Sequence, residues 1–297
     1  MLYSRSICKR HGRLWFALVV AALCLLCSAA LGAISVTVTK SGDVFLKDSR
    51  TAKKTKFMTL KDIYSGHYHA AEYCNGCVYV IRRLGWRDDR PENPDYKDEL
   101  WRYDKYKHGR KLWSGQGMDF RVSPDGKVIA VASSTSSKPY PCHLYLLDAK
   151  GKMRKDFAPA GVVKGDFDFE RWDGGYLWVK DQDESDILGF IRIDTRSLRL
   201  VKYPAPSGLA DLDYDLNTKS LLLAYSDYPV ILESDGGNRY ERSKSRVNLY
   251  AYNLRAKHKR TIAVCITDLF NPKWVGSNTL EFDNPKGKGR IRRHISL

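Results

Sequence analysis

The sequence predicts an all-β protein made of repeated four-stranded units, and one hairpin and its recurrence carry this prediction. The clearest unit spans residues 119–157, where Asp125 and Gly126 form a turn between two runs of alternating apolar residues, a strong signal for a β-hairpin. A third strand follows at residues 144–147, and the turn at 148–152 leads into a fourth. One such sheet cannot bury both of its faces alone, so each unit must pack against copies of itself.

The third strand and its turn recur along the chain. The residues that close this strand are Asp104, Asp148, Asp194 and Asn253, which gives steps of 44, 46 and 59 residues. A four-stranded repeat of about 40–50 residues is typical of a β-propeller blade. We expect five antiparallel blades, beginning near residues 67, 117, 166, 211 and 266, or six if residues 34–60 form a short blade of their own.

The last expected blade, residues 266–297, contains only three strand patterns. A ring closes without free sheet edges when the first strand of the chain completes its last blade. We therefore expect a strand within residues 34–47 to fill this position.

The segment from Val122 to Lys127, followed by Ile-Ala-Val-Ala-Ser-Ser, resembles the WD-like repeats of TolB-type periplasmic propellers. In that family the Ser-Pro-Asp-Gly segment joins the innermost strand of a blade to the second strand. The resemblance implies a propeller fold, an exported protein and, as the commonest use in the family, a binding role.

The N-terminus has the pattern of a secretory signal peptide. Four basic residues precede an apolar run at 14–31, and small residues follow. We expect cleavage near Gly32 or Ala33, which leaves residues 34–297 as a single periplasmic or secreted propeller domain. The alternative is an uncleaved membrane anchor at residues 14–31. The full chain has a net charge of +16, and removal of the signal would leave about +12.

Cys74 and Cys77 lie on either side of a two-residue turn. In an oxidising compartment we expect a disulfide that staples this hairpin, with two unpaired thiols as the alternative. Redox-active pairs of this spacing usually open a helix, and the sequence has no helix pattern here. Pairing between Cys142 and Cys265 stays open.

Three connections between second and third strands are longer than a hairpin needs: 86–99, 133–142 and 226–246. In a propeller these connections open on one face, and long loops on a rigid scaffold often carry binding function. This insert face supplies the candidate binding residues Trp86, Tyr96, Tyr140, Tyr228 and Tyr240.

Equivalent positions on the innermost strands carry polar residues that would form a ring in the central channel: His69, Asp119, Asp168, Asp213 and Asp268. Crowded carboxylates could hold a cation or act in catalysis. The alternative is that they accept hydrogen bonds from neighbouring backbone amides. His67 and His69 lack an identifiable third ligand, so we predict neither a metal site nor a cofactor.

Basic residues cluster in the turns between third and fourth strands. The main candidates for this basic rim are Lys107, Arg110, Lys152, Arg154, Lys257 and Lys259. Such a rim could bind anionic polysaccharide, lipopolysaccharide or a membrane surface. The alternative is that lysines on the outer edge of each blade prevent edge-to-edge pairing.

These patterns favour an exported binding or scaffold propeller that contacts a protein or glycan through its insert face and is not catalytic. We expect no nucleic-acid partner for an exported chain. The alternative is a carbohydrate-active hydrolase that uses Asp119, Asp168, Asp213 and Glu170, although Glu170 is out of phase with the aspartates. Two carboxylates about 5–10 Å apart in an open pocket would favour the enzyme.

Overall fold

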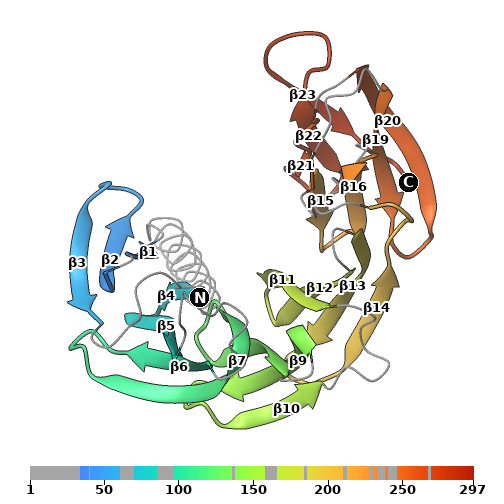
Figure 1. Cartoon of the computed structure of the whole chain (residues 1–297). Helices are drawn as coiled ribbons and strands as arrows, with labels where there is room; N and C mark the ends of the chain where they lie inside the picture. The colour runs from blue at the N-terminus through green and yellow to red at the C-terminus, as the bar shows by residue number, and fades with distance from the viewer. Residues whose placement is uncertain are drawn as a thin grey trace, which may run out of the picture.

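The structure is a computed structural model that describes residues 34–39, 41–60, 70–85, 96–135, 138–157, 166–183, 186–209, 213–227, 231–232, 238–239, 246–266 and 269–297. Over these residues it contains strands and turns and no helix, as the sequence predicts. Among the described residues there is no apolar helix of membrane-spanning length. The sheets stand side by side in an arc around a common centre (Figure 1).

The first and last sheets have three strands each. The first contains β1 (Ile34–Val38), β2 (Asp43–Asp48) and β3 (Lys54–Thr59). The last contains β21 (Lys273–Trp274), β22 (Thr279–Asp283) and β23 (Arg290–His294).

Between them lie four four-stranded blades. The second contains β4 (Ala71–Cys74), β5 (Cys77–Leu84), β6 (Lys97–Tyr103) and the first half of β7 (Gly109–Val122). The third contains the second half of β7, β8 (Val128–Thr135), β9 (Lys138–Asp148) and β10 (Met153–Phe157). The fourth contains β11 (Asp166–Asp173), β12 (Tyr176–Asp183), β13 (Asp186–Asp194) and β14 (Leu200–Pro204). The fifth contains β15 (Tyr214–Asn217), β16 (Leu222–Ser226), β19 (Arg246–Asn253) and β20 (His258–Ile266).

Each pair of neighbouring sheets shares a hydrophobic cluster. Between the third and fourth blades, for example, Ala130 and Leu146 pack with Phe167, Phe169 and Val179, and all five side chains are buried. Equivalent clusters join the other neighbouring sheets along the arc. The expectation that each sheet buries its faces against other copies is confirmed.

The expected closure is corrected. Residues 34–60 form a sheet of their own, as the six-blade alternative requires, and β1 pairs with β2 instead of completing the last blade. The physical reason is burial: Val36, Val38 and Val44 pack against Val78 and Val80 of the second blade. The first and last sheets therefore stand at the two ends of the arc (Figure 1).

The recurring Asp or Asn after a third strand has a structural role. Asp104, Asp148, Asp194 and Asn253 each accept, through Oδ1, a hydrogen bond from the backbone N–H two residues further on. Such Asx turns fix the reversal of the chain, which explains why this residue type marks the repeat.

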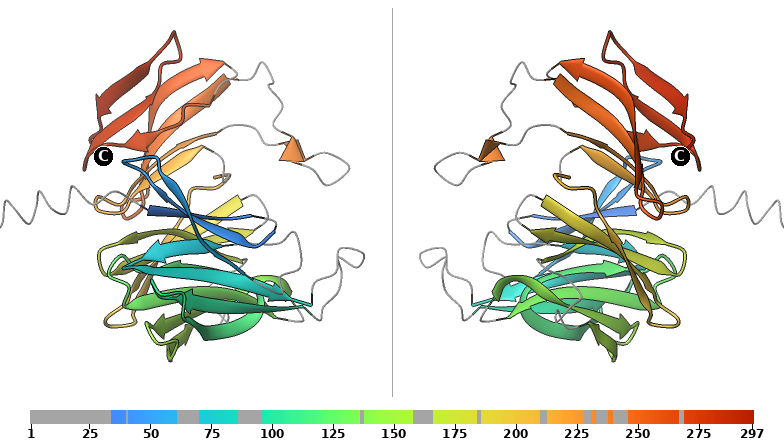
Figure 2. Two further views of the ribbon diagram at one scale, coloured as in Figure 1. Left: turned by 90° about the vertical axis from the view of Figure 1, so that its left-hand side faces the viewer. Right: turned by 90° about the vertical axis from the view of Figure 1, so that its right-hand side faces the viewer.

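The antiparallel order of the blades gives the molecule two distinct faces. Turns between first and second strands, and between third and fourth strands, lie on one face, which we call the turn face. Connections between second and third strands, and linkers between blades, lie on the opposite, insert face. Within the 226–246 connection, β17 (Ile231–Leu232) and β18 (Asn238–Arg239) form a small sheet that stands out from the blades on that side (Figure 2).

Candidate functional site

Acidic side chains on the innermost strands connect several pairs of neighbouring blades. Glu72 Oε2 accepts a hydrogen bond from the Val122 N–H at 2.7 Å. Asp215 Oδ2 accepts one from the Trp274 N–H, also at 2.7 Å. Both are contacts between neighbouring sheets, so these acids bind the blades together.

Two of the expected ring residues have nearby cationic partners. Asp119 accepts hydrogen bonds from the Phe120 N–H at 2.7 Å and from Arg121 Nη1 at 3.1 Å. Burial raises the pKa of Asp119, and the negative charge of Asp168 adds to this rise. Asp168 Oδ2 lies 2.6 Å from Nζ of Lys180, whose side chain is buried.

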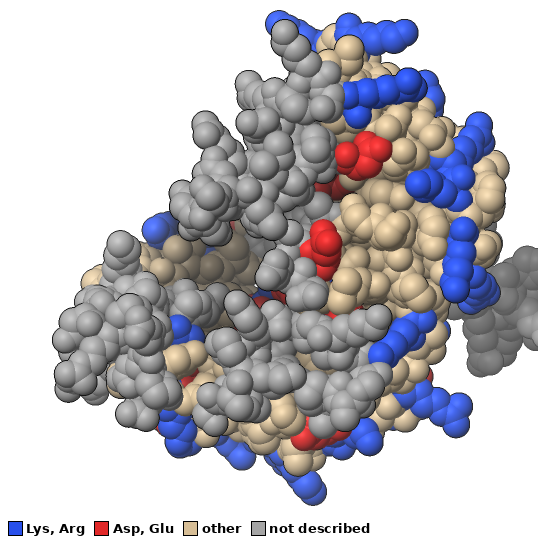
Figure 3. Space-filling view, turned by 45° about the vertical axis from the view of Figure 1, so that its right-hand side comes forward, with Lys and Arg blue, Asp and Glu red and all other residues tan. Residues whose placement is uncertain are grey.

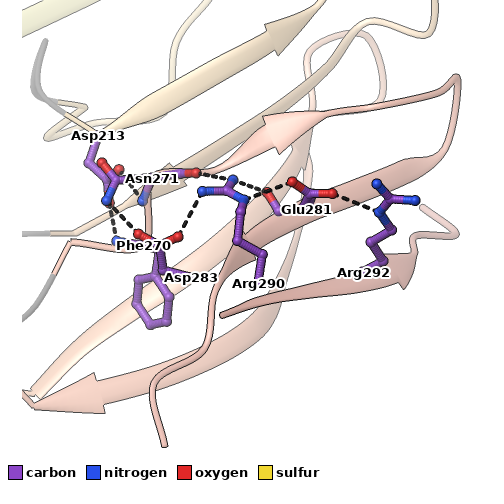
Figure 4. A network of polar contacts seen from close by, with 7 residues as sticks. All are labelled: Asp213, Phe270, Asn271, Glu281, Asp283, Arg290 and Arg292. Carbon is purple, nitrogen blue, oxygen red and sulfur yellow. Dashed lines mark hydrogen bonds and ion pairs between the residues drawn. The ribbon is translucent and has the colours of Figure 1, made fainter. Parts of the chain in front are cut away.

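Asp213 is the most enclosed of the described ring residues, with 5% of its surface exposed. Its carboxylate accepts a hydrogen bond from Ser226 Oγ at 2.7 Å. It also accepts hydrogen bonds from the Phe270 N–H at 2.9 Å and the Asn271 N–H at 2.8 Å (Figure 4). Burial raises the pKa of Asp213 despite these donors. This geometry matches the alternative in which the acids hold the backbone of a neighbouring blade.

A β-bulge explains the position of Glu170. The pairing of β11 with β12 shifts register between Phe169 and Arg171, which breaks the alternation along the strand. The Glu170 side chain is 7% exposed and bonds to Arg171, while its Oε2 accepts the Tyr214 hydroxyl at 2.6 Å. In the sequence, Glu170 is one residue out of phase with the aspartates, which counts against a shared catalytic role. Because of the bulge, this spacing does not determine the direction of the Glu170 side chain.

A polar pocket of about 720 Å³ lies where the innermost strands of the fifth and sixth sheets meet. Its lining combines aromatic, cationic, amide and acidic side chains: Arg171, Asp213, Tyr214, Asp215, Asn271, Pro272, Lys273, Trp274, Glu281 and Arg290. Residues from β11, β15, the linker before β21 and all three strands of the last sheet contribute to it. The pocket is thus assembled from three blades.

Two arginines of this pocket are each held by two carboxylates. Arg290 lies 2.8 Å from Glu281 and 2.7 Å from Asp283, and its Nη2 also donates to the Asn271 carbonyl (Figure 4). Arg171 Nη2 lies 2.7 Å from Glu170 and 2.9 Å from Asp215. Such charge-assisted pairs fix the guanidinium groups before any ligand arrives.

Trp274 and Lys273 are adjacent but differ in their restraints. The Trp274 backbone N–H and its indole Nε1 both bond to Asp215, to the carboxylate and to the carbonyl respectively, so the ring is oriented. Lys273 is exposed, and no acidic partner for it is found among the described residues. Sequence reasoning missed Trp274, Lys273 and Arg290, because the innermost strand of their blade has only two residues.

Several of the predicted residues lie outside the described residues. Of the ring these are His69 and Asp268, and of the insert face they are Trp86, Tyr228, Tyr240 and the side chain of Tyr140 in β9. Tyr96 is described: the guanidinium of Arg83 lies over its ring at 4.4 Å. The basic-rim residues are all exposed in their turns.

The expected disulfide is corrected. Cys74 and Cys77 face each other across the β4–β5 turn as free thiols. Their sulfurs have other partners: Cys74 Sγ donates to the Ser123 carbonyl at 3.5 Å, and Cys77 Sγ accepts from Arg102 Nη2 at 3.2 Å. Burial raises the pKa of the Cys74 thiol, which does not favour a reactive thiolate.

Among the described residues, no group of three or more His, Cys, Asp or Glu side chains could hold a metal ion. The described residues include Asp119, Asp168 and Asp213 but not His69 or Asp268.

Comparison with known proteins identifies the architecture. No protein-family model and no curated protein sequence matches the chain. An oligogalacturonate lyase in complex with manganese matches 87% of this chain and 72% of its own, with 13% identity and a TM-score of 0.55. The fold is that of a β-propeller. An oligogalacturonate lyase from Vibrio parahaemolyticus is similar to the same extent, with 11% identity, a TM-score of 0.55 and coverage of 87% and 73%. At these identities the likeness concerns the fold alone.

Proposed function

We propose that this propeller is a binding protein for an acidic oligosaccharide, which it holds in the pocket around Trp274 without transforming it. An oriented indole beside fixed polar side chains suits a sugar ring, which presents an apolar face and a rim of hydroxyl groups. The single observation that carries the proposal is this oriented Trp274 beside Arg171, Arg290 and the exposed Lys273.

The engaged carboxylates argue against hydrolysis. A glycosidase needs one carboxylic acid and one carboxylate facing the scissile bond. Here the Asp213 carboxylate accepts three hydrogen bonds. Asp168 forms an ion pair with Lys180. Glu170 contacts both Arg171 and Tyr214. Protonation and nucleophilic attack would both require these contacts to break.

One exposed cation of the pocket, Lys273, suits an acidic group of the ligand. Arg171 and Arg290 add no net positive charge, because each lies between two carboxylates. Structures with the same fold include enzymes for oligogalacturonate, a chain of sugar acids. Oligogalacturonate is therefore the first ligand to test.

We also propose that the protein is exported. The N-terminal pattern at residues 1–33 and the Ser-Pro-Asp-Gly segment of a TolB-like blade support a periplasmic or secreted protein. A protein partner at the long connections of the insert face is compatible with the same pocket, because the pocket lies at the start of the innermost strands.

Calorimetric titration with oligogalacturonate, and with a neutral oligosaccharide of equal length, tests the proposal. We expect binding of the acidic ligand, a loss of about tenfold or more in Trp274→Ala, and a selective loss for the acidic ligand in Lys273→Ala. Tyr176→Ala, an exposed aromatic residue on the turn face, is the matched control and should bind normally.

Two results would overturn the proposal. Unchanged affinity in Trp274→Ala would place the ligand elsewhere, for example on the insert-face connections. Turnover of oligogalacturonate that disappears in Asp168→Asn would instead support the carbohydrate-active enzyme.

A further inference from the structure

The turn face carries basic side chains that have no acidic partner within the described part of the chain. They come from the β6–β7, β9–β10, β13–β14 and β19–β20 turns, and all are exposed: Lys105, Lys107, Arg110, Lys150, Lys152, Arg154, Lys155, Arg196, Arg199, Arg255, Lys257, Lys259 and Arg260. Lys and Arg side chains stand out along the outer edge of the molecule (Figure 3).

The acids of these turns do not pair with the cations. Asp104, Asp148 and Asp194 use their Oδ1 atoms to accept backbone N–H groups of their own turns. Asn253 does the same in the fourth turn without carrying a charge. Each turn therefore holds its own shape while its ammonium and guanidinium groups extend into solvent.

Exposed apolar side chains lie on the same face. The large hydrophobic residues with at least two fifths of their surface exposed are Tyr106, Met153, Tyr176, Val201, Ile266 and Val275. All of them except Ile266 lie in, or next to, a turn between first and second strands or between third and fourth strands. By the antiparallel order of the blades, both kinds of turn open on the turn face.

The exposed apolar side chains among the cations indicate whether the turn face suits a soluble polyanion or an anionic bilayer. A soluble polyanion needs only the charges, since aliphatic groups such as Met153, Val201 and Val275 gain nothing from sulfate or carboxylate. An anionic bilayer attracts Lys and Arg through its negative surface potential. Its interfacial region also accepts Tyr, Met and Val side chains.

We infer that the turn face docks the protein onto a bilayer surface rich in anionic lipids, while the saccharide pocket opens on the other side. The inference does not depend on the saccharide: it uses different residues on the opposite face. It also differs from insertion of residues 14–31, since attraction through surface charges must weaken with salt.

Co-sedimentation of the full chain with vesicles tests this inference. The vesicles contain phosphatidylglycerol and phosphatidylcholine in equal parts, or phosphatidylcholine alone. We expect binding only to the anionic vesicles, at least about tenfold weaker at roughly 0.5 M salt than at low salt. The triple variant Lys107→Glu, Lys152→Glu, Lys257→Glu should lose binding, while Met153→Ser should weaken it less.

A charge-matched triple variant on the insert face is the control. Lys97, Lys286 and Lys288 are exposed and lie at connections between second and third strands. Their reversal to Glu changes the net charge by the same amount and should leave vesicle binding nearly intact. Equal loss in both triple variants, or binding that resists the turn-face reversal, overturns the inference. So does competition by soluble dextran sulfate combined with no effect of Met153→Ser, which would indicate an anionic polysaccharide.

Discussion

The pocket and the turn face both contain cationic side chains but restrain them in opposite ways. In the pocket, Arg171 and Arg290 are each fixed between two carboxylates. On the turn face, Lys107, Lys152 and Lys257 extend into solvent, and the nearby acids bind backbone amides instead. The difference shows that the role of a basic residue in this fold depends on where the acids of its blade are engaged.

The two arrangements suit different kinds of recognition. Fixed, neutralised guanidinium groups add directional hydrogen bonds at defined positions but little long-range field. Unpaired surface charges act over about 8 Å at physiological ionic strength and attract an extended partner without a defined orientation. A small ligand therefore suits the pocket, and a broad anionic surface suits the turns.

The largest expected effect is on stability at the pocket. Asp213→Asn replaces a carboxylate that accepts three hydrogen bonds with an amide that has one acceptor oxygen. At least one buried donor is left unsatisfied, so we expect a loss of about 1–3 kcal/mol in unfolding free energy by urea denaturation. A variant as stable as the wild type would mean that electrostatic repulsion among the acids outweighs their hydrogen bonds.

The pH dependence of two Asp→Asn variants sharpens the comparison. Burial raises the folded pKa of Asp213, so its contribution to stability is greatest below the unfolded value near 3.8 and declines as pH rises through the folded pKa. Hydrogen bonds from the backbone lower the pKa of Asp148, so its contribution is present above 3.8 and is lost as pH falls through the folded pKa.

Urea unfolding from pH 7 down to acid should therefore move the two variants in opposite directions. The cost of Asp213→Asn should grow as pH approaches about 4, whereas the cost of Asp148→Asn should vanish in more acidic solution. Parallel pH profiles would contradict the contrast between buried and exposed acids.

The smallest expected effect concerns the shape of the turns. Lys107 and Lys257 have φ values of 70° and 55°, in the left-handed region, where the β9–β10 turn has Gly151 at 84°. Replacement of either lysine by glycine relieves this strain, and we expect unchanged stability or a gain of up to about 1 kcal/mol. Thermal unfolding measures the stability of these variants. Their vesicle binding should still fall, because a positive charge is lost. A clear loss of stability would show that these lysines support the fold itself.

The fold could be predicted from the sequence because its signals are local. The Asp125-Gly126 turn and the Asp or Asn after each third strand act through backbone geometry within a few residues, so their repeat identifies the blades. Closure could not be predicted in this way, because it depends on whether β1 gains more by packing against the second blade than by pairing with β23.

The candidate site was only partly accessible from the sequence. Asp213 was predicted as a ring residue, but its actual partners, Phe270 and Asn271, lie in a linker that has no repeat pattern. The bulge at Glu170 shifts the phase on which the sequence argument depended. Trp274 is placed by a contact with Asp215 across 59 residues, a distance at which no local pattern operates.

The uninterrupted strand β7 has a consequence for how the molecule comes apart. It runs from Gly109 to Val122 and serves as the outer strand of one blade and the inner strand of the next, which makes a single seven-stranded sheet. The other neighbouring blades belong to separate sheets, so no ladder hydrogen bonds join them within the described residues. The second and third blades should therefore exchange their amide protons as one cooperative unit, with the slowest rates along this part of the chain. Under force, the neighbouring blades should separate from this pair before the pair itself is divided.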